Sequence, residues 1–266
     1  MTSKTLAIVG CGKLAEIVVD AVIEGLLPDY QLIGLFSKTP EKAQRLAEKM
    51  QTANCGYVCR ACATQEDLLA LKPDYIVESA SPAAMKELAL PALKNGSSIV
   101  TLSVGVFADE DFYNEVKKVA RQNNARVHIA SGAIGGFDVL RTVSLMGSCE
   151  ASIDTEKGPN SLKDTSVYDE ALQTEKRKVF EGNAKEAIAL FPTKVNVAVA
   201  ASLASVGPMD MKVSVTSTPG YVGDDHRIEI NSKQVKAVID VYSETAQIAG
   251  WSVVNTLRNI TSPIVF

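Results

Sequence analysis

The sequence has little net charge, no long hydrophobic run and few histidines or cysteines. Its 266 residues carry a net charge of −4, which gives no basic field to attract nucleic acid or an anionic membrane. The apolar run Leu6–Val9 ends at a glycine and is too short for a signal-peptide core or a membrane span. We therefore expect a cytoplasmic protein that binds neither nucleic acid nor membrane.

The five cysteines form an odd count with no export signal, so a disulfide framework is not expected. Cys55, Cys59 and Cys62 lie close enough in the sequence to be considered as zinc ligands. A zinc site would need a fourth ligand, and the only histidines are His128 and His226. We expect free thiols and no metal.

Strand and helix patterns alternate over the first 130 residues. An apolar run, a glycine-rich turn and a segment with apolar residues at helical spacing fill 6–24, and a buried strand follows at 32–36. This alternation predicts an α/β fold with a doubly wound, Rossmann-type parallel sheet over residues 1–130. Within it, a helix at 82–96 is expected to be interrupted at Pro91.

The pattern changes after residue 130. Several β-like pieces, the last at 226–230, surround helical segments at 183–192 and 196–207. This arrangement predicts a second, α+β domain over 131–242 with a mostly antiparallel sheet. The stretch 243–266 is expected to be helical and to pack back on the first domain.

A dinucleotide-binding turn is expected at the start of the chain. Gly10, Gly12 and Ala15 fit the pattern G-x-G-x-x-A, directly after a strand and directly before a helix. Glycine permits the tight turn and a close approach to a pyrophosphate, and the helix N-terminus, with Lys13 and Leu14, offers free N–H groups. The alternative is a glycine turn that only packs.

The end of the second strand bears on which dinucleotide is bound. A carboxylate there would accept hydrogen bonds from the ribose hydroxyls of NAD and repel a 2′-phosphate. This chain has Ser37, Lys38 and Thr39 instead, and their hydroxyls and cation suit a 2′-phosphate. NADP is therefore favoured over NAD, the alternative being that Lys38 is a solvated loop residue.

Three loops rich in small residues follow the later strands of the first domain, at 78–81, 103–105 and 131–136. Ligands bind outside the carboxyl ends of strands in open α/β sheets, so these loops are expected to form one ligand-binding face. The residues assigned to the cofactor here are Ala80 and Ser81, and those assigned to the substrate are Ser131 and Gly132.

His226 is the candidate general base. It stands in "GDDHRIEI", where Asp224 or Asp225 could hold its ring in one tautomer, and a useful base would have a pKa near 7. A surface histidine in a polar turn is an equally acceptable interpretation of this stretch. His128, between apolar residues in "RVHIA", is expected to be a satisfied strand histidine.

Several segments carry a family resemblance. In order, "ESASPAA", "SVGVFADEDF", "SGAIGGFDVL" and "VFEGNAKEAIALFPTKVNVAVAASLASVG", followed by His226, resemble the L-aspartate dehydrogenase family. The resemblance implies a Rossmann domain, an α+β domain for substrate binding and oligomerisation, and a homodimer. It also implies oxidation of an amino acid by NAD or NADP to an imine, which water hydrolyses to an oxo acid and ammonia.

Site residues follow from the resemblance by position. His226 matches the catalytic histidine, and Ala133 and Asn196 match cofactor-contacting positions. Three places depart from the family pattern: Asp224 stands where asparagine is common, Lys194 replaces an asparagine, and "YSETA" keeps only Thr245 of an N-P-K-T-S segment.

These departures leave the substrate open. If the lost segment helps to bind carboxylates, Lys194 is expected to supply a replacement cation, with Thr245 beside the substrate. The alternatives are a dehydrogenase or imine reductase for another amine, and a non-catalytic NADP-binding sensor.

Overall fold

The computed structural model describes residues 3–266, which form two compact units. Unit 1 takes in residues 3–106, 110–130 and 249–266, and unit 2 takes in 107–109 and 131–248. The chain thus leaves unit 1 after its last strand and returns to it with its final helix.

Unit 1 is built on a six-stranded sheet with the order β3-β2-β1-β4-β5-β6. Every neighbouring pair is parallel, which confirms the predicted doubly wound sheet. The strands are β1 (Lys4–Val9), β2 (Tyr30–Phe36), β3 (Arg60–Ala61), β4 (Tyr75–Glu78), β5 (Ser98–Thr101) and β6 (Val127–Ile129).

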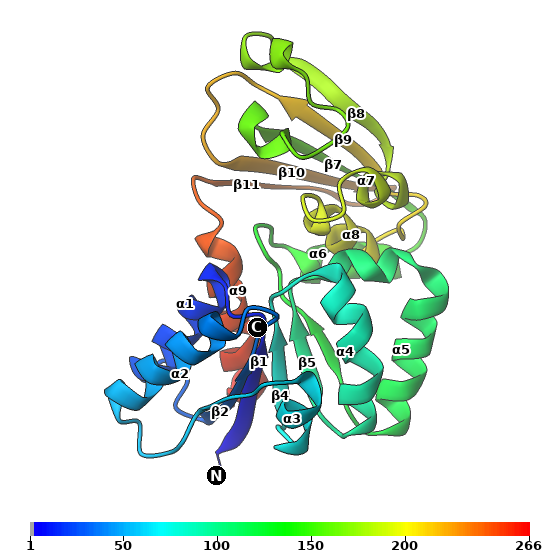
Figure 1. Ribbon diagram of the computed structural model, residues 1–266. Coiled ribbons are helices and arrows are strands. Elements are labelled where there is room, and N and C mark those ends of the chain that lie inside the picture. The colour runs from blue at the N-terminus through cyan, green and yellow to red at the C-terminus, as the bar shows by residue number, and fades with distance from the viewer. Residues whose placement is uncertain (1–2) are drawn as a thin grey trace. The chain divides into compact units, whose positions relative to one another are not determined.

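Helices cover both faces of this sheet, with α1, α2 and α9 on one side and α4 and α5 on the other (Figure 1). Parallel strands need such crossover helices, and these bury the sheet on both faces. The helices are α1 (Lys13–Ile23), α2 (Pro40–Ala53), α3 (Gln65–Ala70), α4 (Pro82–Lys94), α5 (Glu110–Gln122) and α9 (Gln247–Thr261), with a 3₁₀ turn, η1, at Val104–Ala108.

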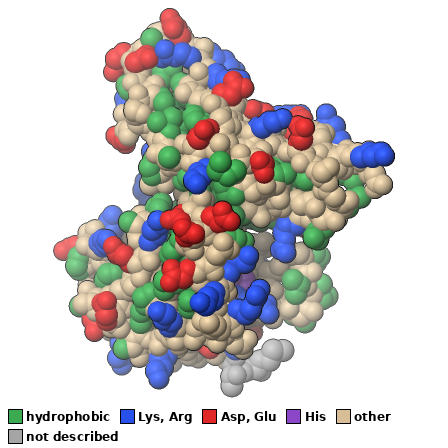
Figure 2. All heavy atoms as spheres, turned by 90° about the vertical axis from the view of Figure 1, so that its right-hand side faces the viewer, with side chains coloured by type: hydrophobic (Ala, Val, Ile, Leu, Met, Phe, Trp, Pro, Cys, Tyr) green, Lys and Arg blue, Asp and Glu red, His purple; other side chains and the backbone are tan. Residues whose placement is uncertain are grey.

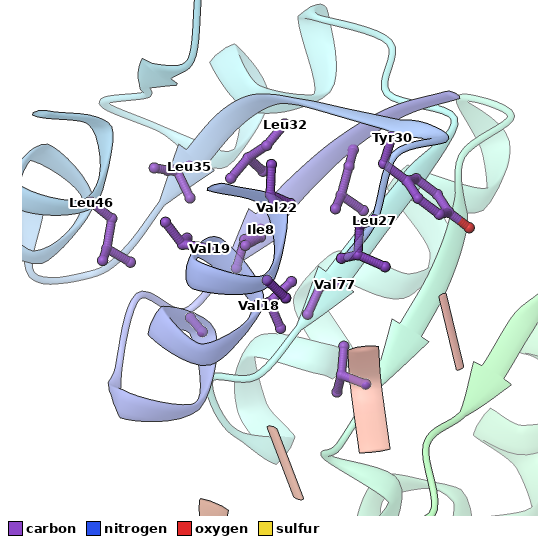
Figure 3. Close-up of a cluster of buried hydrophobic side chains, with 14 of the residues drawn as sticks. Ile8, Val18, Val19, Val22, Leu27, Tyr30, Leu32, Leu35, Leu46 and Val77 are labelled. Carbon is purple, nitrogen blue, oxygen red and sulfur yellow. The ribbon is translucent and has the colours of Figure 1, made fainter. Parts of the chain in front are cut away.

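The core between β1, β2 and α1 is drawn in Figure 3. Ile8 of β1 and Leu32 of β2 are fully buried and face the apolar side of α1, to which Val19 belongs. Burial of one such side chain contributes about 1.5–3 kcal/mol to stability. Helix α9 joins this core, because the Tyr30 hydroxyl donates to the Leu257 carbonyl at 2.8 Å.

Helix α4 runs without a break through Pro91, so the predicted interruption is wrong. Proline removes the N–H that would bond the carbonyl of Glu87, four residues earlier. The side-chain amide of Gln65 reaches that carbonyl at 3.5 Å and gives it a partner. The proline also lies in the last turn, where little helix remains to be disturbed.

Unit 2 contains a five-stranded sheet with the order β11-β10-β7-β9-β8. Only β7 and β9 are parallel, so the prediction of a mostly antiparallel sheet is confirmed. The elements are α6 (Phe137–Leu145), β7 (Cys149–Lys157), β8 (Arg177–Asn183), α7 (Ala184–Leu190), α8 (Asn196–Leu203), β9 (Lys212–Ser217), β10 (Asp224–Ser232) and β11 (Lys236–Ser243), with 3₁₀ turns η2 (Pro159–Leu162) and η3 (Glu170–Gln173).

The last strand of unit 2 differs from expectation. Strand β11 continues to Ser243, so the final helix begins at Gln247 and not at residue 243. The alternation of apolar and polar residues in "KAVIDVYS" is a half-buried strand pattern, and antiparallel pairing with β10 stabilises it.

The surface carries charges of both signs. On the face drawn in Figure 2, Lys and Arg are interspersed with Asp and Glu, in keeping with a net charge of −4. Within residues 3–266, none of the helices has the length and apolar character needed to cross a bilayer.

Candidate functional site

The glycine turn of unit 1 fits a dinucleotide. Gly10 has a φ of +92°, and a Cβ added there would lie 2.6 Å from the Ala80 Cβ, so only glycine is accommodated. Around Gly12, the N-cap of α1, a Cβ would meet no described atom within 4 Å, which leaves space beside the helix start. The first N–H groups of α1, those of Lys13 and Leu14 included, have no acceptor in their own helix and suit a pyrophosphate.

A buried carboxylate, Glu78, organises the next loop. Its Oε1 accepts hydrogen bonds from the Ala80 N–H at 2.9 Å, the Ser81 N–H at 3.1 Å and the Ser103 hydroxyl at 3.0 Å. Its Oε2 accepts one from the Thr101 hydroxyl at 2.6 Å. Burial raises the pKa of Glu78, and these donors oppose the increase.

This network fixes the loop against the glycine turn. The Ser79 hydroxyl donates to the Gly10 carbonyl at 3.0 Å, and the Ser81 hydroxyl caps α4 by accepting from the Ala84 N–H. Because Glu78 is fully buried and holds the N–H groups of Ala80 and Ser81, it faces the protein rather than the ligand-binding face expected for it. These two N–H groups are therefore not available to bind a cofactor, which can contact only the exposed surface of the loop.

The end of β2 is open to solvent. The Ser37 hydroxyl accepts from the Thr39 N–H at 3.2 Å, and the Lys38 ammonium lies 3.5 Å from the Glu87 carboxylate. The Lys38 side chain is 70% exposed, and an ion pair in such a setting contributes little energy. Lys38 is therefore free to turn toward an anionic ligand.

In unit 2, the loop Ser131–Gly136 lies beside the start of α8. A Cβ added at Gly132 would lie 3.8 Å from Val197, the second residue of that helix, and Asn196 is the first. The loop that carries Ala133 and the helix start at Asn196 are thus neighbours in the fold.

The register of the unit 2 sheet places a set of polar groups at one end of its buried face. Residues paired across β11, β10, β7 and β9 form rows on this face. The row farthest from the end of β7 is apolar, and the rows nearer that end contain polar residues. The three rows, from deep to end, are Ile239–Ile228–Ile153–Val213, then Val241–His226–Thr155–Val215, then Ser243–Asp224–Lys157–Ser217.

His226 lies inside the protein. It is 2% exposed, and its Nδ1 lies 3.0 Å from the Thr155 hydroxyl, so the surface-turn interpretation is wrong. Burial, together with the nearby Lys157 cation, lowers the pKa of His226 to about 4, although Asp224 acts in the opposite direction. This differs from the expected value near 7 and makes the ring neutral at neutral pH.

Of the two aspartates before the histidine, Asp224 is the relevant one. Side chains alternate along a strand, so Asp224 and His226 share the buried face and Asp225 faces the other way. There the Asp225 carboxylate lies 3.5 Å from the Tyr221 hydroxyl. Its pKa is raised by burial and by a hydrogen bond to Asp240.

Lys157 and Ser217 were not identified from the sequence. The Lys157 side chain is 3% exposed, and its ammonium lies 3.3 Å from the Asp224 carboxylate and 3.5 Å from the Lys194 carbonyl. The buried Ser217 hydroxyl has no hydrogen-bond partner among residues 3–266. The available signal was the alternation of Ala151, Ile153 and Thr155, which puts Lys157 on the same inward face.

Two expected substrate residues have other contacts. Lys194 precedes α8 and approaches Lys157 through its backbone carbonyl. The Thr245 hydroxyl accepts from the Gln247 N–H at 3.3 Å, at the start of α9. Thr245 follows β11, whose last residue, Ser243, pairs with Asp224, so it belongs to the same end of the sheet.

The cysteines and acidic residues provide no metal centre in the part of the chain that the structure describes. All five cysteines are free thiols. Burial raises the pKa of Cys11 and of Cys59 to about 12, which keeps both protonated and unreactive.

Two family models match this chain. The NAD-binding domain of homoserine dehydrogenase matches residues 10–130, and the C-terminal domain of aspartate dehydrogenase matches residues 138–260. L-aspartate dehydrogenase of Methanococcus maripaludis (strain C5) is 30% identical over 97% of both chains, and that of Methanosarcina acetivorans is 31% identical over the same shares.

This chain belongs to the L-aspartate dehydrogenase family. The crystal structure of aspartate dehydrogenase from Thermotoga maritima superposes with a TM-score of 0.76 at 28% identity and covers 99% of each chain. A hyperthermophilic archaeal homoserine dehydrogenase in complex with NADPH shares the fold, with a TM-score of 0.63 at 14% identity over both whole chains.

Proposed function

We propose that this aspartate dehydrogenase family member oxidises L-aspartate with a nicotinamide cofactor, giving iminoaspartate and then oxaloacetate and ammonia. The observation that carries the proposal is His226, a neutral, buried imidazole beside a hydroxyl, a carboxylate and an ammonium group. Family membership supports the substrate, and the turn at Gly10 and Gly12 supports the cofactor.

Residues 1–130 with the final helix act as the cofactor-binding domain, and 131–242 as the substrate and oligomerisation domain. The residues that bind the cofactor in this proposal are Gly10, Gly12, Lys13, Leu14, Ser37, Lys38, Ala80, Ser81, Ala133 and Asn196. Those assigned to the substrate are Ser131, Gly132, Lys194 and Thr245.

His226 acts as the general base. In the tautomer that donates Nδ1–H to the Thr155 hydroxyl, Nε2 keeps its lone pair and accepts a proton from the substrate amine, or from the water that adds to the imine. The bound nicotinamide supplies the acceptor for the hydride that leaves the substrate α-carbon. Each turnover consumes one water and gives oxaloacetate, ammonium, one reduced cofactor and one proton.

NADP is favoured over NAD. Lys38 is exposed at the end of β2 and held only by a long surface ion pair, so it can reach a 2′-phosphate. In this proposal the protein acts in the cytoplasm and is a homodimer, the dimer being what the family resemblance implies.

The test is the initial rate with L-aspartate, and in reverse with oxaloacetate and ammonia, each with both cofactors. Turnover that depends on aspartate supports the proposal, and a higher kcat/KM with NADP supports the role of Lys38. Absence of turnover with aspartate, alongside turnover of another amine or oxo acid, would replace aspartate with that substrate. The departures at Asp224, Lys194 and Thr245 make this second outcome the main alternative.

A further inference from the structure

The polar end of the unit 2 sheet contains hydrogen-bonding capacity that the protein does not use. The Lys157 ammonium has three N–H donors, yet its contacts to Asp224 and to the Lys194 carbonyl are 3.3 and 3.5 Å long. A charged N–H···O bond is ordinarily about 2.7–2.9 Å. Next to Lys157 in the sheet register, the fully buried Ser217 hydroxyl has no partner among the described residues.

A buried cation and a buried hydroxyl left in this state are costly, since both have given up water without a full replacement. A ligand with an anionic oxygen would satisfy both groups at once. Carboxylate is the fitting chemistry, because each oxygen accepts more than one hydrogen bond.

We propose that the Lys157 ammonium and the Ser217 hydroxyl bind a carboxylate of the substrate and thereby hold the substrate amine at His226. This proposal rests on the proposed function, because it takes the ligand to be the amino acid that is oxidised. It assigns the substrate-binding cation to Lys157 in place of Lys194, which contacts Lys157 through its backbone carbonyl.

The spacing fits an amino acid. Residues two apart on one face of a strand are separated by roughly 7 Å, and Lys157 and Asp224 each lie two residues from the row that holds Thr155 and His226. A carboxylate held at Lys157 can therefore place the neighbouring α-carbon and amine within reach of the imidazole.

The present partners of Lys157 can be exchanged. The Asp224 side chain is 38% exposed, so water can solvate it when a substrate carboxylate takes its place beside the ammonium. The Lys194 carbonyl belongs to the segment between α7 and α8, and the Lys157 side chain that it contacts is 3% exposed. Because Lys157, Ser217 and His226 are all buried, substrate entry requires the residues that cover them to shift.

The test uses matched pairs of variants. Lys157→Met removes the ammonium but keeps the volume, and Lys212→Met is its control, because Lys212 is an exposed lysine that pairs with Glu150. Ser217→Ala removes the orphan hydroxyl, and Ser214→Ala is its control on the opposite face of β9, where Ser214 donates to Asp154.

For each variant, steady-state rates give the KM for L-aspartate and kcat, and titration calorimetry gives the affinity for succinate, a dicarboxylate without an amine. We expect Lys157→Met to raise the KM and weaken succinate binding by about 10- to 100-fold, and Ser217→Ala by about 3- to 10-fold. NADPH affinity, measured by fluorescence, should stay within about two-fold, as should every constant of both controls.

Two amides distinguish which carboxylate is bound. L-asparagine lacks the side-chain carboxylate, and L-aspartate α-amide lacks the other. The wild type should not oxidise the amide that lacks the carboxylate bound by Lys157. Lys157→Met should no longer distinguish that amide from L-aspartate.

The outcomes separate this inference from the proposed function. If the wild type oxidises aspartate and both variants retain its KM, the carboxylate site is wrong and the function stands. If aspartate is not oxidised but succinate binding depends on Lys157, the function is wrong and the site stands. If the wild type does neither, both are wrong. Should Lys157→Met fail to fold by circular dichroism, Ser217→Ala decides in the same way.

Discussion

In each unit, polar groups lie at one end of a buried sheet, but the two sets of groups differ in how fully they are hydrogen-bonded. In unit 1, Glu78 accepts four hydrogen bonds of 2.6–3.1 Å from its own loop and from the end of β5. In unit 2, Lys157 has two long contacts and Ser217 has no partner among residues 3–266.

The difference separates a structural network from a ligand site. A buried network in which every group is hydrogen-bonded fixes the backbone conformation. Around Glu78, it holds the loop in contact with the glycine turn. A buried cluster with unused donors is costly to keep unless a ligand completes it.

The largest effect is expected at His226. His226→Asn keeps a polar side chain of similar size but removes the base, so kcat should fall by about 10²- to 10⁴-fold. Affinity for NADPH should be unchanged, because the glycine turn belongs to unit 1. Steady-state rates beside a fluorescence titration measure both quantities, and an unaltered kcat would exclude His226 as the base.

Breaking the network at Glu78 comes next. Glu78→Leu leaves two N–H groups and two hydroxyls without their acceptor and should lower the free energy of unfolding by about 3 kcal/mol or more. It should also weaken NADPH binding, because the loop supports the turn at Gly10. Glu78→Gln retains an oxygen for the backbone N–H groups and should remain close to wild type. Urea unfolding of the pair measures the effect, and equal losses in both would show that hydrogen bonding is not its cause.

The buried histidine should make stability depend on pH. The folded-state pKa of His226 is about 4 against an ordinary 6.5, so below pH 6.5 the unfolded chain takes up a proton that the folded chain does not. Stability is therefore lost as pH falls from about 6.5 to about 4, by up to roughly 3 kcal/mol. His226→Asn should lose less over this interval, as measured by urea unfolding at several pH values. Parallel curves for both proteins would contradict the lowered pKa.

The smallest effect is expected at the exposed end of β2. Lys38→Ala should weaken NADP binding by about 3- to 10-fold and leave NAD binding unchanged, since only the 2′-phosphate loses its cation. Lys42→Ala, in α2, is the control. Equal effects on both cofactors would remove Lys38 from the discrimination.

Local patterns in the sequence were sufficient to predict the alternating strands and helices of unit 1 and the glycine turn. The turn residues act on their own neighbours, so strand, glycines and helix can be recognised without the rest of the fold. Helix α4 differs because the amide that compensates for Pro91 comes from Gln65, twenty-six residues earlier. A partner so distant in the chain is not visible in the helix's own sequence.

His226 was identified, but its environment was not. Its pKa depends on burial and on Lys157, which strand register brings to the adjacent row. The same register separates Asp224 from Asp225 by face. Register joins β7 to β9 across 60 residues and β7 to β10 across 67 to 83 residues, and this is why Lys157 and Ser217 were missed.

The most direct test of the contrast is the KM for L-aspartate of Lys157→Met and of Glu78→Gln, measured side by side with the wild type. The account predicts a KM about 10- to 100-fold higher for Lys157→Met and a wild-type KM for Glu78→Gln. A wild-type KM in Lys157→Met would contradict it.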